Sequence, residues 1–398
     1  MTAHLTVIRN AHGPLSKTFT LKDGTLQKTA TADLVEGHAT RVAIDDIHGL
    51  ANVLAGLDAS EALTFGVTRN RVARIATQAA VKRGRALGAI CRDREHFRWP
   101  NGRGVLMLDI DRPKDGSAPF TPKSFDDLMR GLFPWWHGCA RLYRASASAF
   151  IYDANGVELS GAGSLRGYAV ADRAENIPHL GVAIVDAFWR AGFGRIEFSA
   201  SGSMLVRCPV DDAVWQPERL DFAGPAVLGE GLRQSPRAPI VVDGADIDTE
   251  AVIAGGPGKI TLSTWRAGSL HVCRAKQAAR PTEKARRKSY IAERVKQEKQ
   301  RGGNAAAARR KWTAAVADKS LSGDFALHFQ FQGFATVDEV LSDPERFDFE
   351  RLADPSEPTY ANDPRIAQFY WNGGRPHIYS HAHGGCKYVL AAEGGGDA

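Results

Sequence analysis

The chain has 398 residues, 43% hydrophobic and 24% charged, which is typical of a soluble globular protein and argues against extended disorder. Its length predicts two or three units, and the absence of a long apolar run or a secretory signal predicts a cytoplasmic protein that does not enter membranes. The five cysteines never form a C-x-x-C pair, which argues against a disulfide framework and a thiolate zinc site.

The positive charge is concentrated in one segment. The net charge of the chain is +6, but residues 274–311 contain 14 Lys and Arg against 3 Glu. This segment therefore carries +11 and the rest of the chain sums to −5. Such a basic segment favours a polyanionic partner.

The first hundred residues are predicted to form a mixed α/β unit. Asp45 and Asp46 precede apolar residues at helical spacing (Leu50, Val53, Leu57), which predicts a helix starting near residue 47. From residue 105 the sequence VLMLDIDRP predicts a buried strand that ends at a Pro and Lys-Asp-Gly turn.

The middle of the chain alternates between helix and strand patterns. Ser124 is predicted to cap a helix, and strands are expected over 146–153 and 165–172. A helix over 178–191 and a strand run over 195–211 follow. This order of elements is typical of an α/β or α+β protein.

The last third is predicted to be more varied. Residues 234–244 are expected to be a surface connection, and 283–317 to form basic helices interrupted at Gly302 and Gly303, with Asn304 as a cap. The segment FALHFQF alternates as a half-buried strand does, and TVDEVLSDP predicts a short capped helix. The final fifty residues are rich in Pro, Gly, Tyr and His, which predicts a small β module.

Asp109 and Asp111 are the first candidates for chemistry. Residues two apart in a strand point to the same face, so their carboxylates project together. Two carboxylates suit Mg²⁺ or Mn²⁺ completed by nucleotide phosphates, although an isolated D-x-D is more often simply the acidic end of a strand. A third carboxylate, Asp211, ends another strand-like run, as a two-metal phosphoryl-transfer site requires.

The order of these motifs resembles motifs I, II and III of the archaeo-eukaryotic primase superfamily. The wording SGSMLVRCPVDDAVWQPERLDFAG and LADPSEPTYANDPRIAQFYWNGGRPHIYSHAHGG is similar to the primase-polymerase regions of plasmid and phage replication proteins. The resemblance covers residues 10–390. It implies a catalytic core with an RRM-like sheet, in which Asp109, Asp111 and Asp211 are the catalytic metal ligands.

The resemblance also divides the chain. It implies a primase-polymerase domain over 1–240, made of an N-terminal α/β unit (1–100) and a metal-site core (101–240). A connector (241–282), a basic helical segment (283–345) and the small β module (346–398) follow.

Motif II departs from the family pattern. Arg166 stands where the family has a phosphate-binding His, and a guanidinium also binds phosphate. Ser146, Ser148 and Ser164 are candidates for the serine of the motif, and each is more often an ordinary strand or turn serine. Arg207 is expected either to contact the triphosphate or template or to form a salt bridge.

Two other motifs resemble binding sites. GGPGKIT at 255–261 fails as a phosphate-binding loop because the first Gly of the pattern falls on Ile253 and Ile260 follows Lys259. His381 and His383 resemble the histidine pair of an HUH nicking enzyme, or a metal site with His377 and Cys386. A turn-rich β module is the simpler interpretation.

The implied partners are nucleic acid and nucleotides. We expect the basic segment to follow template phosphates, with aromatic side chains (Tyr290, Trp312) stacking on bases. The residues concerned are Arg286, Arg287, Lys288, Arg309, Arg310, Lys311 and Trp312. A solvated helix surface is the alternative. The sequence shows no helicase domain, so any unwinding is expected from a helicase supplied by another protein.

The predicted function is primer synthesis or extension on a single-stranded DNA template from nucleoside triphosphates. Two alternatives stay open at this point: a non-catalytic DNA-binding replication protein that keeps the fold, and a metal-dependent nuclease.

Overall fold

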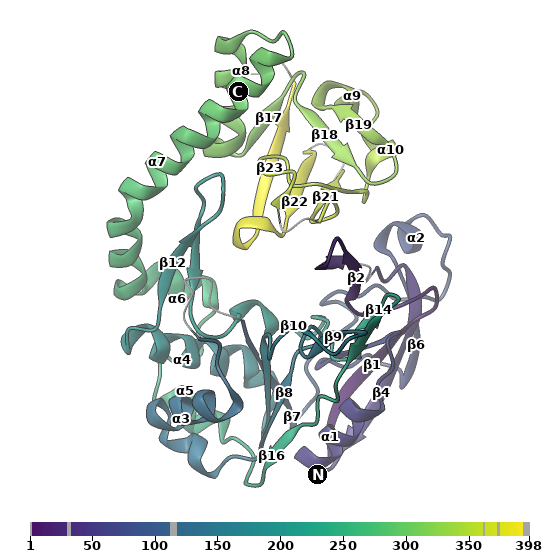
Figure 1. Ribbon diagram of the computed structural model, residues 1–398, viewed down its shortest axis with the longest axis vertical. Helices are drawn as coiled ribbons and strands as arrows, with labels where there is room; N and C mark the ends of the chain where they lie inside the picture. The colour runs from purple at the N-terminus through teal and green to yellow at the C-terminus, as the bar shows by residue number, and fades with distance from the viewer. Residues whose placement is uncertain (1, 30–32, 112–117, 361–362, 372–374, 393–398) are drawn as a thin grey trace. The chain divides into compact units, whose positions relative to one another are not determined.

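A computed structural model describes residues 2–29, 33–111, 118–360, 363–371 and 375–392 (Figure 1). The chain divides into two compact units: Met1–Gly194 with Cys208–Ser269, and Arg195–Arg207 with Leu270–Ala398. The predicted mixed α/β class is confirmed. Of the helices in the described ranges, none is long and apolar enough to cross a membrane.

One sheet of the first unit comes from the N-terminal residues. Its strand order is β5-β1-β4-β6, and its core includes Ile8, Ala39 and Phe97. The predicted helix is confirmed as α1 (Ile47–Gly56), because the Asp46 side chain accepts the backbone N–H of Gly49. The strands are β1 (Ala3–Asn10), β4 (Glu36–Ile44), β5 (Glu61–Thr64) and β6 (Val72–Ala76).

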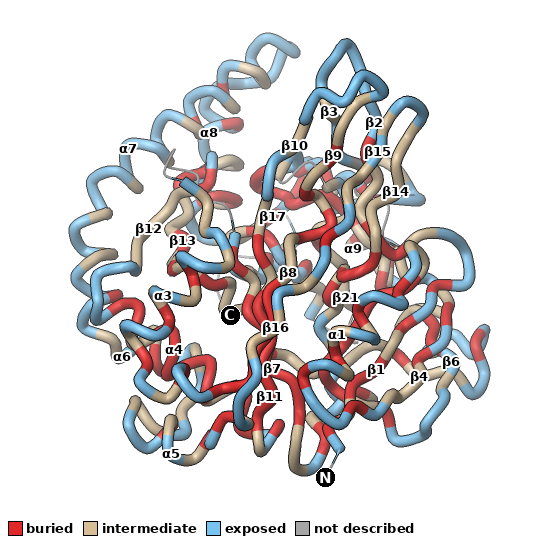
Figure 2. Tube along the Cα trace, turned by 60° about the horizontal axis from the view of Figure 1, so that its bottom comes forward, coloured by how far each residue is buried: buried red, intermediate tan, exposed pale blue. Residues whose placement is uncertain are grey.

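The second sheet of this unit carries the predicted acidic strand. The order is β16-β8-β11-β7, with all neighbours antiparallel, and β7 and β11 are largely buried (Figure 2). The helices α3 and α4 follow β7 and β11 along the chain. The bounds are β7 (Gly104–Ile110), α3 (Pro122–Leu132), β8 (Arg141–Ala145), β11 (Leu165–Ala171), α4 (Ile177–Arg190) and β16 (Ile240–Val242).

The structure corrects three local predictions. Residues 146–150 form a turn, and the paired strands are β8 before it and β9 (Ile151–Asp153) after it. Residues 234–244 lie largely at the surface as predicted, but they are more than a connection, because Ile240–Val242 form β16, which pairs with β8. Thr121, not Ser124, caps α3; Ser124 is the third helical residue, and the two side chains form a reciprocal capping box.

Short elements complete the first unit. A small sheet has the order β14-β2-β3 and another has the order β10-β9-β15. The bounds are β2 (Thr18–Lys22), β3 (Thr25–Thr29), α2 (Gln78–Lys82), β10 (Glu158–Ser160), β14 (Val227–Leu228), β15 (Leu232–Gln234), α5 (Thr249–Ala254) and α6 (Leu262–Gly268).

The second unit contains a seven-stranded sheet with the order β17-β23-β22-β21-β20-β18-β19. Its buried face includes Phe329, Phe369 and Tyr388 and packs with residues of α9. The predicted alternating strand and capped helix are confirmed as β18 and α9. The bounds are β17 (Ser320–Ser322), β18 (Ala326–Phe329), β19 (Gly333–Thr336), α9 (Val337–Ser342), α10 (Pro344–Phe347), β20 (Arg351–Leu352), β21 (Ala367–Tyr370), β22 (His377–Ser380) and β23 (Cys386–Ala391).

The basic segment forms helices in this second unit. Helix α7 (Leu270–Gln300) starts earlier than predicted, and α8 (Ala305–Thr313) follows the predicted break. Asn304 caps α8 as expected, accepting the N–H groups of Ala306 and Ala307. The hairpin of β12 (Arg195–Phe198) and β13 (Met204–Arg207) also belongs to this unit.

A close helix contact in the first unit generates a stability prediction. A Cβ atom added at Gly181 of α4 would lie 2.1 Å from the Trp215 ring. Gly181→Ala should therefore lower the free energy of unfolding by about 1 to 3 kcal/mol through overpacking, as measured by urea denaturation. Gly131→Ala in α3 is the matched control, because a Cβ there meets nothing within 4 Å. Equal effects of the two substitutions would contradict the packing argument.

Candidate functional site

The acidic end of β7 lies against Arg166 of β11. Asp109 and Arg166 are register partners, and a guanidinium nitrogen of Arg166 donates to the Asp109 carboxylate. Both side chains are mostly buried, at 15% and 13% exposure. Leu108 and Ile110 are fully buried, as the strand periodicity predicted. Asp111 is exposed, and its carboxylate lies 3.5 Å from the Ser164 hydroxyl.

A second carboxylate at this position, Asp221, was not predicted. Its side chain has no exposed surface; it accepts the Tyr168 hydroxyl at 2.6 Å and lies 3.4 Å from the Arg166 Nε. Burial, followed by the charge of Asp221, raises the pKa of Tyr168 well above its ordinary value, so the phenol stays a donor. Two backbone hydrogen bonds to Leu63 fix Asp221 beside β5.

Three arginines surround a small gap beside this network, and the gap has no room for a water molecule. Arg144, Arg166 and Arg237 share it with Tyr168 and the residues Ala145, Ser146, Ala147, Phe222 and Ala223. Arg144 donates to the backbone oxygens of Ala223 and Arg237, and Arg237 donates to those of Ala145, Ala223 and Gly224. Within the described residues, neither Arg144 nor Arg237 forms an ion pair. Burial lowers the pKa of Arg144 and lowers that of Arg237 to about 10.

Lys17 adds a fourth cation. Burial, together with the charges of Arg166 and Lys28, lowers its pKa to about 8 against the opposing charges of Asp111 and Asp221. Lys17 is therefore still mostly protonated at neutral pH but is held in unfavourable surroundings. A polyanion bound nearby would relieve this strain.

Asp211 lies beside Asp109 through the backbone. Its N–H donates to the Asp109 carbonyl at 2.8 Å, while its carboxylate accepts the Ala213 N–H at 3.0 Å and caps a short 3₁₀ turn. The turn is held by the Trp215 indole, which donates to the Met107 carbonyl of β7. The next residue, Asp212, pairs with Arg266.

The predicted metal ligands are thus neighbours along two backbone segments but do not form a cage. Within the ranges that the structure describes, no three His, Cys, Asp or Glu side chains are arranged to hold a metal ion. Asp109 and Asp111 nevertheless provide the hard oxygen donors that Mg²⁺ prefers, and Mg²⁺ usually takes only one or two carboxylates together with water and phosphate oxygens. The oxygen donors of Asp109 and Asp111 suit the ion chemically, but the Asp109 carboxylate is bonded to Arg166 and the Asp211 carboxylate is engaged in its own turn.

Of the other predicted nucleotide-binding residues, the three serines lie together and Arg207 belongs to the other unit. Ser146 lines the arginine pocket and its hydroxyl bonds that of Ser148 at 2.9 Å. The Ser146 N–H donates to the Ser164 carbonyl, so the three serines lie close together. Arg207 ends β13 in the second unit and donates to the neighbouring Val206 carbonyl.

The predicted nucleic-acid residues of α7 and α8 differ in their surroundings. Lys288, Arg309 and Arg310 are exposed. Arg286 lies over the Phe198 ring, Arg287 pairs with Glu283, and Lys311 pairs with Glu298 and Asp324.

The two aromatic residues proposed to stack on bases are engaged in packing. The Trp312 ring lies between Phe325 and the Arg294 guanidinium, and its indole N–H donates to Glu298 at 2.6 Å. The Tyr290 hydroxyl donates to the Ser356 carbonyl at 2.5 Å. These contacts give both rings a role in packing α7 and α8 against the rest of the second unit.

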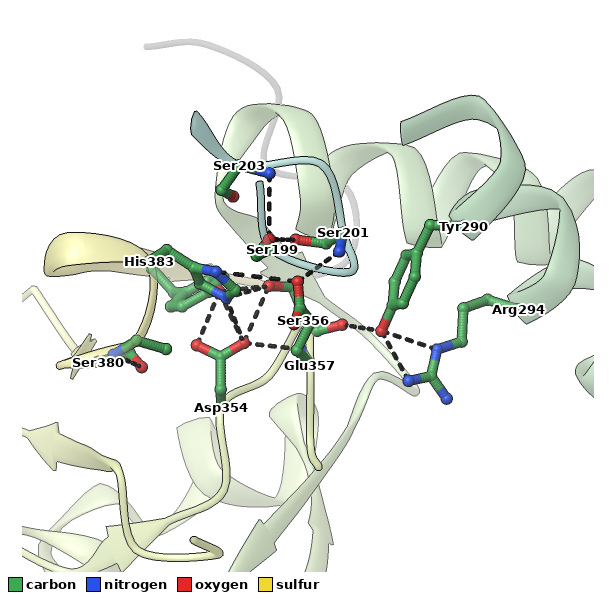
Figure 3. Close-up of polar contacts among 12 residues, drawn as sticks. Ser199, Ser201, Ser203, Tyr290, Arg294, Asp354, Ser356, Glu357, Ser380 and His383 are labelled. Atoms are coloured by element: carbon green, nitrogen blue, oxygen red, sulfur yellow. Dashed lines mark hydrogen bonds and ion pairs between the residues drawn. The ribbon is translucent and has the colours of Figure 1, made fainter. Parts of the chain in front are cut away.

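A buried polar cluster lies in the second unit (Figure 3). His383 Nε2 lies 3.2 Å from Asp354 and 3.4 Å from the Ser356 hydroxyl, and the Glu357 carboxylate accepts the Ser201 N–H. Burial tends to raise the pKa of Asp354, but the hydrogen bond and charge of His383 outweigh this and the pKa falls to about 2.

This cluster does not form a nucleophilic triad. A Ser-His-Asp relay places the acid and the serine on different imidazole nitrogens, whereas Nε2 of His383 faces both. The side chains of His383 and Asp354 are 2% and 0% exposed, so no substrate reaches them. The cluster instead joins the β12–β13 turn to the seven-stranded sheet.

The remaining histidines have separate contacts. His377 stacks on Tyr370 and His381 meets the edge of Tyr379, whereas His383 meets Tyr360 and Asp354. The paired His arrangement of an HUH enzyme is not indicated by these contacts.

Comparison with known proteins adds no relative from which the role of these residues could be inferred. No family model, curated protein or solved structure matches the chain.

The surroundings of Lys17 generate a pH prediction. Its pKa is about 8 in the folded protein against an ordinary 10.5, so between these values the unfolded chain binds the proton and the folded chain does not. The contribution of Lys17 to the unfolding free energy therefore rises with pH in this window. Lys17→Met should stabilise the protein at pH 7 by up to about 3 kcal/mol, and the gain should vanish near pH 10.5.

Urea denaturation across this pH range measures the effect. Lys22→Met is the control, because Lys22 is exposed on β2, and it should show no such pH dependence. A stability difference for Lys17→Met that is constant with pH would contradict the assignment.

Proposed function

We propose that the first unit is the catalytic part of a primase-polymerase that joins nucleotides on a single-stranded DNA template. The observation that carries the proposal is the placement of Asp109 and Asp111 at the end of β7, next to a pocket lined by three arginines. Carboxylates for metal ions and cations for a triphosphate are the two requirements of nucleotidyl transfer. The motif resemblance, with its RRM-like sheet, supports the same conclusion.

The arginine pocket offers positive charge for the triphosphate, and its side chains would have to move apart to admit one. Arg144 and Arg237 contact only backbone oxygens, so their charges are not matched by carboxylates of the described chain. A planar guanidinium binds phosphate oxygens through two parallel hydrogen bonds, and it stays charged at working pH. Arg166 and Lys17 add positive charge on the side of Asp111.

In this proposal Asp109 and Asp111 hold a divalent ion, Mg²⁺ or Mn²⁺. The ion would supply charge neutralisation for the triphosphate and a lower pKa for the attacking hydroxyl. Arg166 is bonded to Asp109 in the structure, so its guanidinium has to give up part of this contact when a cation binds there. An incoming phosphate offers Arg166 the replacement partner.

A second candidate function rests on the same contact. If the Arg166–Asp109 ion pair persisted when nucleotide binds, Asp109 would not be available to a metal ion. The protein would then bind nucleotide or DNA without polymerase activity. The metal-dependent nuclease is a third possibility that product analysis distinguishes.

The direct experiment is incubation with a single-stranded template, labelled nucleotides and Mg²⁺ or Mn²⁺, with and without a primer. We expect metal-dependent extension products, and Asp109→Ala should reduce incorporation at least a thousandfold while leaving the fold intact, because a metal ligand is lost. Asp127→Ala is the control, since Asp127 lies on the surface of α3 and pairs with the exposed Lys123.

The outcomes separate the candidates. Extension that survives Asp109→Ala would contradict the assigned site. Shortened template in place of extension would identify a nuclease, and tight nucleotide binding without either product would identify the non-catalytic protein.

The arginine pocket makes a separate prediction. Arg144→Met should weaken triphosphate binding about tenfold or more, while the free energy of unfolding changes little because a buried, unpaired charge is removed. Isothermal titration with a nucleoside triphosphate and urea denaturation measure the two quantities. Arg190→Met on the surface of α4 is the control, since Arg190 pairs with Asp186 at 56% side-chain exposure. Unchanged triphosphate affinity in Arg144→Met would contradict the role of the pocket.

A further inference from the structure

The seven-stranded sheet of the second unit has one face that its own core does not use. Buried and outward positions alternate along each strand, as in β18, where Leu327 and Phe329 are buried and His328 is exposed. The inward residues form the core with α9, so the outward residues lie on the opposite face. The outward residues of β18 to β23 are Ala326, His328, Phe334, Thr336, Arg351, Gln368, Tyr370, His377, Tyr379, Lys387, Val389 and Ala391.

This outward face is rich in rings. Phe334 is 76% exposed and its ring stacks on His328, with centroids 4.4 Å apart and planes 8° from parallel. Tyr370 stacks on its register partner His377 at 5.3 Å and 17°. Tyr379 is 39% exposed on the neighbouring position. Flat rings that lie against one another on a sheet leave further ring faces for a planar ligand.

One row of outward residues crosses β20 to β23 and contains two cations and one ring, and the Tyr370–His377 pair lies in the next row. Register pairs connect Arg351 to Gln368, Gln368 to Tyr379, and Tyr379 to Lys387. Burial and the neighbouring Tyr379 raise the pKa of Tyr370, Arg351 opposes the shift and Asp348 adds to it, so these side chains share one environment. With strands about 4.8 Å apart, the six strands β19 to β23 span about 24 Å.

The charge of the face is positive. Arg351 and Lys387 are its charged residues, and none of the outward residues of the seven strands is a carboxylate. Two acids lie next to the strands of this face. Glu350 accepts the backbone N–H groups of Phe331 and Gln332, and Asp348, whose charge acts on Tyr370, accepts the Trp371 N–H at 2.8 Å. The face therefore matches an anionic partner.

We infer that this sheet face binds single-stranded nucleic acid by base stacking. Phe334, Tyr370 and Tyr379 provide the ring surfaces, and Arg351 and Lys387 provide contacts to phosphates. Sequence-independent single-strand binding combines these two elements: stacking on aromatic side chains and a positive surface that follows the backbone. A four-stranded sheet that stacks bases on its exposed aromatic residues is an established form of this recognition.

Other occupants fit the face less well. A duplex hides its bases, so it would contact the cations but not the rings. A protein partner would favour a larger apolar patch, whereas glutamine, histidine and basic residues interrupt the rings here. The face lies in a different unit from Asp109, and the inference does not depend on the proposed catalytic activity.

The experiment is fluorescence anisotropy of the full chain with a short oligothymidylate, in the presence of a chelator and without nucleotide. Phe334→Ala and Tyr379→Ala should each weaken binding about tenfold, as expected for the loss of one base stack, and the double variant should weaken it further. Leu270→Ala is the matched control, because Leu270 is a 68% exposed apolar residue of the same unit and should leave the affinity unchanged.

The measurement also distinguishes the alternatives. The loss should be confined to single strands, since affinity for a duplex of the same length should change less than twofold. Unchanged single-strand affinity in the double variant would overturn the inference, and so would an equal loss for duplex. Because no catalysis is measured, repeating the titration in the Asp109→Ala background shows whether this inference stands when the proposed catalytic function fails.

A second readout locates the contact. Photo-crosslinking with an oligonucleotide that contains bromodeoxyuridine, followed by peptide mapping, should mark β19, β21 or β22. Crosslinks confined to α7 and α8, with Arg309→Ala and Arg310→Ala removing all binding, would place the strand on the basic helices and overturn the inference.

Discussion

The first unit depends on the burial of one carboxylate, Asp221. A carboxylate with no exposed surface is stable only when it is paired and hydrogen-bonded, and Asp221 has the Tyr168 hydroxyl and the Arg166 guanidinium as partners. Its backbone is bonded to Leu63 of β5, so the same residue connects the N-terminal sheet to β11 of the second sheet. The position of Arg166, and hence the environment of Asp109, follows from this pairing.

The charges around Asp221 are balanced only in part. Arg166 lies between Asp221 and Asp109, whereas Arg144 and Arg237 have backbone oxygens as their partners. Carbonyl dipoles solvate a guanidinium but do not cancel its charge, which explains why burial lowers the pKa of both arginines. An anion should bind more favourably to such a site than to a site whose arginines are already paired with carboxylates. The free-energy cost of burying the arginine charges has already been met when the chain folds. This is the physical reason for proposing phosphate rather than a neutral ligand as the partner of these arginines.

The strand that carries Asp109 could be predicted from its local sequence pattern. The role of Asp221 could not, because it depends on contacts with residues that are distant in the sequence. The apolar run before Asp109 and the period of two indicate a buried strand with one acidic face. Asp221 lies in an irregular segment, and its role depends on Tyr168 and Leu63, which are distant in the sequence. The strand β16 was missed for a similar reason: three residues after a proline give too short a pattern, and only pairing with β8 reveals it. Trp312 could be taken for an exposed ring in a basic run because no sequence pattern predicts its contact with Phe325.

The two proposed sites would recognise different parts of a nucleic acid. Salt should therefore change their affinities to different extents. Guanidinium groups in the pocket that contains Arg144 would bind phosphate through charge, an interaction that salt weakens. Rings such as Phe334 and Tyr379 would bind bases through stacking, which depends little on ionic strength. A chain with both kinds of site would keep a nucleic-acid strand bound at high salt, where its affinity for nucleotide is low. The chain crosses between the two units at three points, one of which follows β13, four residues before Asp211.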